Sequence, residues 1–176
     1  LARRARAKYA SVDYAHGIVA CELAAAHVEY RLSNHDAARR TATDALAMAE
    51  TLATPRRSGN ARLLLGMIAV DTRDIAAARA HSECALVAFE ALNDPWGMVE
   101  AQLLRAQAAL VEGDLELASR LLSSASEVDV EEFEPQQHLR LTQAWYAQLA
   151  GEPERAVAAV EQAVATSGEL ERSADH

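Results

Sequence analysis

Small and apolar residues recur along this chain at intervals of about 40 residues. Four polar residues mark the repeat, and each is followed by alanine four and eleven positions later. A small residue stands eight positions before each of the four, and a leucine stands eleven positions before. Positions three or seven apart lie on one helix face, so the pattern predicts paired helices that pack through alanine and leucine. The four polar turn residues are Asn34, Asp74, Asp114 and Glu152, and the packing positions are Leu23, Ala26, Ala38 and Ala45, then Leu63, Gly66, Ala78 and Ala85, then Leu103, Ala106, Ala118 and Ala125, then Leu141, Ala144, Ala156 and Ala163.

Helix boundaries follow from the turn residues. Pro55, Pro95 and Pro135 lie 40 residues apart, and proline is tolerated in the first helical turn because the N–H that it lacks would have no partner there. We therefore expect a single domain of four units. The units are 13–54, 55–94, 95–134 and 135–166, with the end of a preceding helix over 1–10 and a polar tail over 167–176 that frays. The expected helix pairs are 13–32 with 35–52, 56–71 with 74–92, 96–111 with 114–127, and 136–149 with 153–166.

The junction between the third and fourth units departs from the repeat. Five acidic residues lie within residues 127–134, where the other units carry a leucine-rich helix. We expect them to end that helix early and to form a loop. The fourth unit is two residues shorter than the others, which leaves its helix register open. Neither end carries a wholly polar cap, so we expect exposed apolar ends that continue into further repeats or pair with another copy of the chain.

The third unit carries the marks of a known repeat. Ala106, Gly113-Asp114, Ala118 and Ala125 place a small residue in the first helix, Gly-Asp at the turn and two alanines seven apart in the second. This pattern resembles the tetratricopeptide repeat, over about residues 13–166. The resemblance implies an all-α fold, a right-handed α-solenoid of stacked antiparallel helix pairs. The family's usual period is about 34 residues, shorter than the period of this chain.

The longer period points to a particular group of proteins with such repeats. Repeats of this length, with segments like residues 91–97, resemble the arrays of LuxR-type and maltose-activator-like bacterial transcription regulators. The resemblance implies a non-catalytic interaction module of a larger bacterial signalling protein. The chain begins at Leu1 rather than Met, and we expect it to be a piece of something longer.

Composition places the chain among cytoplasmic globular proteins. It is 51% hydrophobic and 24% charged, too apolar for a disordered chain. Charged residues interrupt every apolar run well before the ~18 residues of a membrane span, and no secretory signal is visible. Cys21 and Cys84 cannot form a disulfide scaffold, and their scarcity suits a reducing compartment, although a single bridge stays open.

Charge is distributed unevenly. Residues 1–62 contain ten Arg and Lys against six Asp and Glu, whereas residues 63–176 contain seven against twenty. The net charge of −9 argues against nucleic-acid binding as the main activity. The basic cluster in residues 3–8 lacks interleaved aromatic side chains, and we interpret it as a solvated helix face.

No pattern indicates catalysis, a metal or a cofactor. His81 and Cys84 share one helix turn, but a structural zinc site needs four ligands and no second pair has fitting spacing. We expect a buried thiol and a surface imidazole there. The chain has no glycine-rich phosphate loop and no glycine elbow before a serine. The acidic cluster Glu131, Glu132 and Glu134 is interpreted as a solvated loop, with a site for a cation or a basic partner as the alternative.

The candidate site is the inner face of the array. In tetratricopeptide arrays the first helices of the pairs line a concave groove that binds peptides or small ligands. In this chain the corresponding positions vary from unit to unit while the packing positions do not, as a groove that reads a ligand requires; exposure alone would also let them vary. Arg31 and Arg62 suit a carboxylate, and Trp145 and Tyr30 suit a sugar or an apolar side chain. The candidate binding residues are His27, Tyr30, Arg31, Asn60, Arg62, Met67, Asp71, Glu100, Gln107, His138 and Trp145.

Three functions fit these observations. The first is a module that binds a peptide or protein partner, which could be another domain of the same polypeptide. The second is the sensor of a transcription regulator, which binds a small effector in the groove. The third is a spacer or a self-association domain that pairs through its apolar ends.

Overall fold

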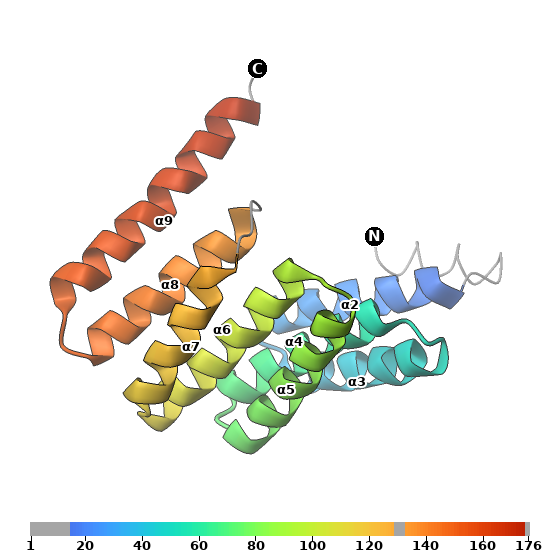
Figure 1. Ribbon diagram of the computed structural model, residues 1–176. Coiled ribbons are helices and arrows are strands. Elements are labelled where there is room, and N and C mark those ends of the chain that lie inside the picture. The colour runs from blue at the N-terminus through green and yellow to red at the C-terminus, as the bar shows by residue number, and fades with distance from the viewer. Residues whose placement is uncertain (1–14, 129–132, 175–176) are drawn as a thin grey trace.

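The computed structural model describes residues 15–128 and 133–174, all arranged as helices joined by short turns (Figure 1). Consecutive helices pack against each other in chain order, which confirms the predicted all-α solenoid of helix pairs. Side chains are described for 15–128 and 136–165. The helices are α2 (Ala15–Arg31), α3 (His35–Thr51), α4 (Pro55–Asp71), α5 (Ile75–Ala91), α6 (Pro95–Glu112), α7 (Leu115–Glu127), α8 (Phe133–Leu149) and α9 (Pro153–Ala174).

Two boundaries differ from the sequence prediction. Helix α8 begins at Phe133, ahead of Pro135, because proline fits anywhere in the first turn, where its missing N–H has no helical acceptor. Helix α9 continues to Ala174, beyond the predicted helix end at residue 166. The predicted helix end over 1–10 and the acidic side chains at 131, 132 and 134 lie outside the described residues. Helix α7 ends early at Glu127, as the acidic run predicts.

Aspartates fix the starts of three helices. Asp74, Asp94 and Asp114 each accept a hydrogen bond from the backbone N–H three residues later, which satisfies a donor that the first helical turn leaves free. At the end of α6, Gly113 adopts φ of 82°, a left-handed conformation that glycine reaches without strain. Asp74 and Asp114, two of the polar turn residues of the sequence pattern, therefore start the second helix of their pairs, and Asp94 starts α6, the first helix of the third pair.

The helices form an inner and an outer row. The inner helices α2, α4, α6 and α8 each contact the next inner helix. The outer helices α3, α5, α7 and α9 each pack on their inner partner, but within the described residues their backbones do not approach one another closely. The outer helices α3, α5 and α7 also pack on the next inner helix, so both rows contribute to the joints between units, and the inner row carries the surface that a ligand could contact across several units.

Most of the predicted packing positions are buried, as the repeat requires. Ala78, Ala85, Ala118 and Ala125 have at most 1% of their surface exposed. Leu141 was predicted to be buried, but it is 47% exposed. It lies on the face of α8 that the preceding units cover with their next inner helix, and no described helix covers it here.

Phe89 packs at the contact between the second and third units. Its ring is fully buried and lies between Gly59 of α4 and Gly97 of α6. A Cβ added to Gly59 would come within 2.7 Å of the ring tip, and one added to Gly97 would overlap the part of the same ring nearest the backbone. Only glycine leaves room for the aromatic ring at both positions.

Candidate functional site

A cavity of about 390 Å³ opens among the four inner helices. Its walls are mostly apolar, and a few polar and charged side chains face the same space. This combination is typical of binding cavities, where apolar walls supply contact area and polar groups fix orientation. The lining residues are Ala20, Leu23 and His27 of α2, Arg57, Asn60, Leu63 and Met67 of α4, Trp96, Glu100 and Leu104 of α6, and His138 of α8.

Repeat spacing explains why these side chains meet. Asn60, Glu100 and His138 each stand fourteen positions before the turn residue of their unit, whereas His27 and Met67 stand seven positions before theirs. Seven residues are about two helical turns, so the two sets share one face. Since successive inner helices lie side by side, equivalent positions line up across them. The structure thus gathers in one cavity five of the residues predicted for the inner face.

A hydrogen-bonded chain joins α6 to α8 at one wall of the cavity. The Nδ1 of His138 lies 2.8 Å from a carboxylate oxygen of Glu100, and its Nε2 lies 2.8 Å from the amide nitrogen of Gln107. The same amide donates to the hydroxyl of Thr142. Because an amide N–H can only donate, Nε2 accepts and Nδ1–H donates to Glu100 in this arrangement. The Glu100 side chain that accepts this bond is only 14% exposed.

The opposite charge comes from α4. Arg57 also lines the cavity, and it has no ion pair with any residue in the described part of the chain. A guanidinium presents a planar set of donors that suits a carboxylate or another anion. His27 is partly exposed, but burial lowers the pKa of its imidazole and favours the neutral form. The cavity therefore offers an acceptor at Glu100, a guanidinium at Arg57 and apolar contact between them.

Tyr30 and Asp71 lie together beyond the cavity. The two side chains hydrogen-bond and so connect α2 to α4. Burial and this carboxylate together raise the pKa of Tyr30 well above its usual value. The ring of Tyr30 also lies 6.0 Å from that of His35, in a tilted arrangement. These predicted residues therefore form a contact between units, and neither is part of the cavity lining.

The other predicted residues lie elsewhere. Arg62 pairs with Glu50 of the outer helix α3 at 2.6 Å, so its guanidinium is already engaged. Arg31 is exposed at the end of α2, outside the cavity lining. Trp145 packs near Ala109 and Ala118 and faces a different cavity, between α8 and α9. Gln107 reaches the site only through His138.

The lining residues that sequence reasoning gave neither an inner-face nor a packing role include Arg57, Trp96 and Leu104. Arg57 stands one helical turn before Asn60, so the same face could have been extended by three residues to include it. Trp96 follows Pro95 directly, within residues 91–97, and was not assigned to the candidate site. Leu104 packs over Gly66 and also reaches the cavity, a dual role that the spacing does not signal.

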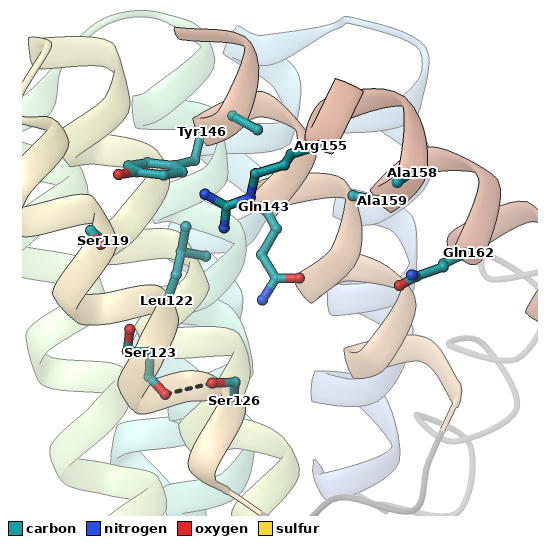
Figure 2. A pocket seen from close by; sticks show the side chains of 11 residues that line it. Ser119, Leu122, Ser123, Ser126, Gln143, Tyr146, Arg155, Ala158, Ala159 and Gln162 are labelled. Carbon is teal, nitrogen blue, oxygen red and sulfur yellow. Dashed lines mark hydrogen bonds between the residues drawn. The ribbon is translucent and has the colours of Figure 1, made fainter. Parts of the chain in front are cut away.

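A second cavity, also of about 390 Å³, lies between α7, α8 and α9 (Figure 2). Gln143 and Arg155 extend from α8 and α9 into the space that faces Leu122 of α7. The hydroxyls of Ser119 and Ser123 line it as well, and Ser126 donates to the carbonyl of Ser123 at 2.7 Å. None of the residues predicted for the inner face lines this cavity.

Other chemistry finds little support in the described residues. Within 15–128 and 133–174, no three His, Cys, Asp or Glu side chains come together as a metal site would require. Cys84 is exposed and His81 is half-buried, the reverse of the sequence expectation, because position 84 lies on the outer surface of α5 while position 81 faces Gly66. Both cysteines are free thiols. Over the same residues, no helix combines the length and the apolar character that crossing a bilayer requires.

Comparison with known proteins supports the fold alone. No family model matches the chain, and no curated protein matches it. The structure is similar to the crystal structure of BtubC (BKLC) from P. vanneervenii, with a TM-score of 0.68 over 89% of this chain. The two sequences are 16% identical, and the match spans 66% of the BtubC chain, just under two thirds of its length.

Proposed function

We propose that this chain is a non-catalytic interaction module that binds a peptide segment of a partner protein along its inner face, in the bacterial cytoplasm. The observation that carries the proposal is the cavity shared by the four inner helices, which varied side chains line and constant small residues support. The resemblance to the tetratricopeptide repeat adds to it. In the regulators that share the long period, the partner could be another domain of the same polypeptide.

The lining favours a segment with one large apolar side chain beside polar groups. Leu63, Met67 and Trp96 would contact the apolar side chain, and its removal from water would supply most of the affinity. Arg57 would bind a carboxylate or a backbone carbonyl of the segment. Glu100 would accept an N–H, since its carboxylate is poorly solvated and gains from every donor it meets.

A small effector is the second candidate, and the size of the cavity favours it. A volume of about 390 Å³ lies at the low end of the range for small-molecule sites, about 300 to 1,000 Å³. In that case the chain would be the sensor of a transcription regulator. The same residues would bind the effector, so ligand class rather than location separates the two functions.

The test begins with peptides selected on the wild-type chain from a random displayed library. Their affinities are measured by calorimetry for the wild type and for Arg57→Ala and Met67→Ala. We expect each substitution to weaken binding about tenfold or more, which corresponds to about 1.4 kcal/mol. Arg120→Ala is the matched control, because this exposed arginine lies on the outer helix α7, away from the cavity, and pairs with Glu116 one turn away.

A thermal-shift screen with metabolites tests the second candidate. A ligand present at about 100 times its dissociation constant stabilises the folded chain by about 2.7 kcal/mol. In a Trp145→Phe background, Trp96 is the remaining tryptophan, so its fluorescence reports occupancy of the cavity directly. Peptides that bind Arg57→Ala and Met67→Ala as tightly as the wild type would show that the inner cavity is not the binding site.

A further inference from the structure

Two opposite charges line the inner cavity without pairing with each other. Arg57 comes from α4, and Glu100 comes from α6, the next inner helix. Within residues 15–128 and 136–165, no carboxylate forms an ion pair with Arg57. Glu100 accepts from His138 through Oε2, and among the same residues its Oε1 accepts no hydrogen bond. Both charged groups therefore retain bonding capacity toward the cavity.

The repeat shows that packing does not require these charges. Arg57 stands seventeen positions before the turn residue of its unit, where the first and third units have Gly17 and Gly97. Glu100 stands fourteen positions before its turn residue, where the first unit has Ala20. A small residue thus suffices at both positions elsewhere in the array. The charged residues of the second and third units therefore fit a role toward the cavity better than a role in the helix contacts.

The fold separates the two charges by a short distance. Glu100 is level with Asn60 on the neighbouring helix, because the two residues are equivalent in the repeat. Arg57 stands three residues before Asn60, which corresponds to about 4.5 Å along the helix axis. The axes of packed helices lie about 8 to 10 Å apart. Since arginine and glutamate are both long side chains, their charged ends can contact opposite ends of one small ligand.

Charge complementarity then selects the class of ligand. A ligand with only a carboxylate would suit Arg57 but would bring a second negative charge close to Glu100, which is poorly solvated. A ligand with only a cationic group would bring a second positive charge close to Arg57. A neutral ligand that displaced water would leave both charges without a charged partner. A zwitterion gives each charge its opposite.

The remaining walls favour a zwitterion with an apolar side chain. Leu63 and Met67 of α4 and Trp96 and Leu104 of α6 line the same cavity. Contact with them would remove an apolar side chain of the ligand from water, which is the main source of affinity for such a group. The volume of about 390 Å³ is at the low end for small-molecule sites, as a ligand of the size of one amino acid requires.

We propose that the inner cavity binds a free α-amino acid with a large apolar side chain. Its carboxylate binds Arg57, and its ammonium group donates to Oε1 of Glu100. Its side chain lies against Met67 and Trp96. His138 is a positioning residue, because its hydrogen bond holds Oε2 of Glu100 and leaves Oε1 to the ligand. The proposal rests on the second function proposed above, a small effector in this cavity, and it names the chemical class of that effector.

Calorimetry with the whole wild-type chain tests the proposal, with L-leucine, L-methionine and L-phenylalanine as the ligands. We expect at least one of them to bind. The amide of that amino acid lacks the carboxylate charge, and its N-acetyl form lacks the ammonium charge. Each derivative should bind the wild type about tenfold more weakly or worse, since each loses one charge-assisted contact. This comparison needs no variant, so it does not depend on how a substitution affects folding.

Two variants assign each charge of the ligand to its partner. Arg57→Ala should weaken binding of the amino acid about tenfold but hardly change binding of its amide. Glu100→Gln should weaken binding of the amino acid to a similar extent but hardly change binding of its N-acetyl form. Arg120→Ala is the matched control, because this exposed arginine lies on α7, away from the cavity. Circular dichroism checks that all variants keep their helix content.

The results separate this proposal from peptide binding. If selected peptides lose affinity in Arg57→Ala and Met67→Ala but none of the three amino acids binds at millimolar concentration, the cavity is a peptide site and the zwitterion proposal is wrong. An amino acid that binds no more tightly than its amide or its N-acetyl form also overturns the proposal. Binding that Arg57→Ala and Glu100→Gln leave unchanged overturns it as well, since the ligand then lies elsewhere.

Discussion

The contact of Phe89 with two glycines gives the most quantitative prediction. Gly59 lies in the interior of α4, where replacing glycine with alanine ordinarily stabilises a helix by about 0.5 to 1 kcal/mol. In this structure, the added Cβ would lie 2.7 Å from the ring tip of Phe89. Gly97 of α6 also packs closely against the ring, which limits the space into which the ring could move.

Overpacking of this kind destabilises a core by about 1 to 3 kcal/mol, more than the gain in helix propensity. We therefore expect Gly59→Ala to lower the free energy of unfolding by about 1 kcal/mol. For a chain of this size, a loss of that magnitude corresponds to a fall in the melting temperature of about 2 to 4 °C.

Urea unfolding followed by circular dichroism measures the effect, and a double-mutant cycle with Phe89→Leu isolates its cause. Phe89→Leu alone should destabilise the chain, since it leaves space around a fully buried side chain. In that background the clash is relieved, and Gly59→Ala should become neutral or stabilising. The expected coupling between the two sites is about 2 kcal/mol. If Gly59→Ala stabilises the chain equally in both backgrounds, the steric argument is wrong.

Three further predictions concern single residues. Asp94→Ala should lower the free energy of unfolding, measured in urea, by about 1 to 3 kcal/mol, because Asp94 is buried, caps α6 and pairs with Arg56 at 3.0 Å. The control is Asp114→Ala, which removes an exposed helix cap and should lower the free energy of unfolding by only about 1 kcal/mol. Burial, together with neighbouring arginines, lowers the pKa of His81 below its ordinary 6.5, so the unfolded chain binds more protons and stability falls as the pH drops through 6.5. His81→Gln should flatten that part of the stability profile, and an unchanged profile would contradict the assignment. Ala53→Gly should stabilise the chain by about 0.5 to 1 kcal/mol in the same urea assay, because Ala53 has φ of 48°, which glycine adopts without strain.

Sequence alone could predict the helix pairs and the buried contacts between them. Ala78 and Ala118 recur at a fixed distance from a polar turn residue, and the joint needs a small side chain there in each unit. Periodicity also predicted which positions face inward. Asn60, Glu100 and His138 come from three units but share one position, and the structure places them in one cavity.

Details that depend on neighbours outside the repeat pattern were not predictable. Arg62 was predicted to bind a ligand, but it forms an ion pair with Glu50 of the outer helix α3. The two residues belong to different units, so the spacing within one unit does not predict their contact. Leu141 follows the packing pattern yet stays exposed, because burial at that position depends on the next unit rather than on its own. The extension of α9 to Ala174 shows that polar composition does not by itself end a helix.

The two rows of helices have a mechanical consequence. Inner helices touch in series, for example where Leu104 of α6 packs over Gly66 of α4, whereas the outer helices do not brace one another within the described residues. Because α5 packs on both α4 and α6, a separation of α4 from α6 must also shift α5 against at least one of them. A group that inserts between α4 and α6 would therefore change the angle between the second and third units, and the helices beyond this joint would move with it.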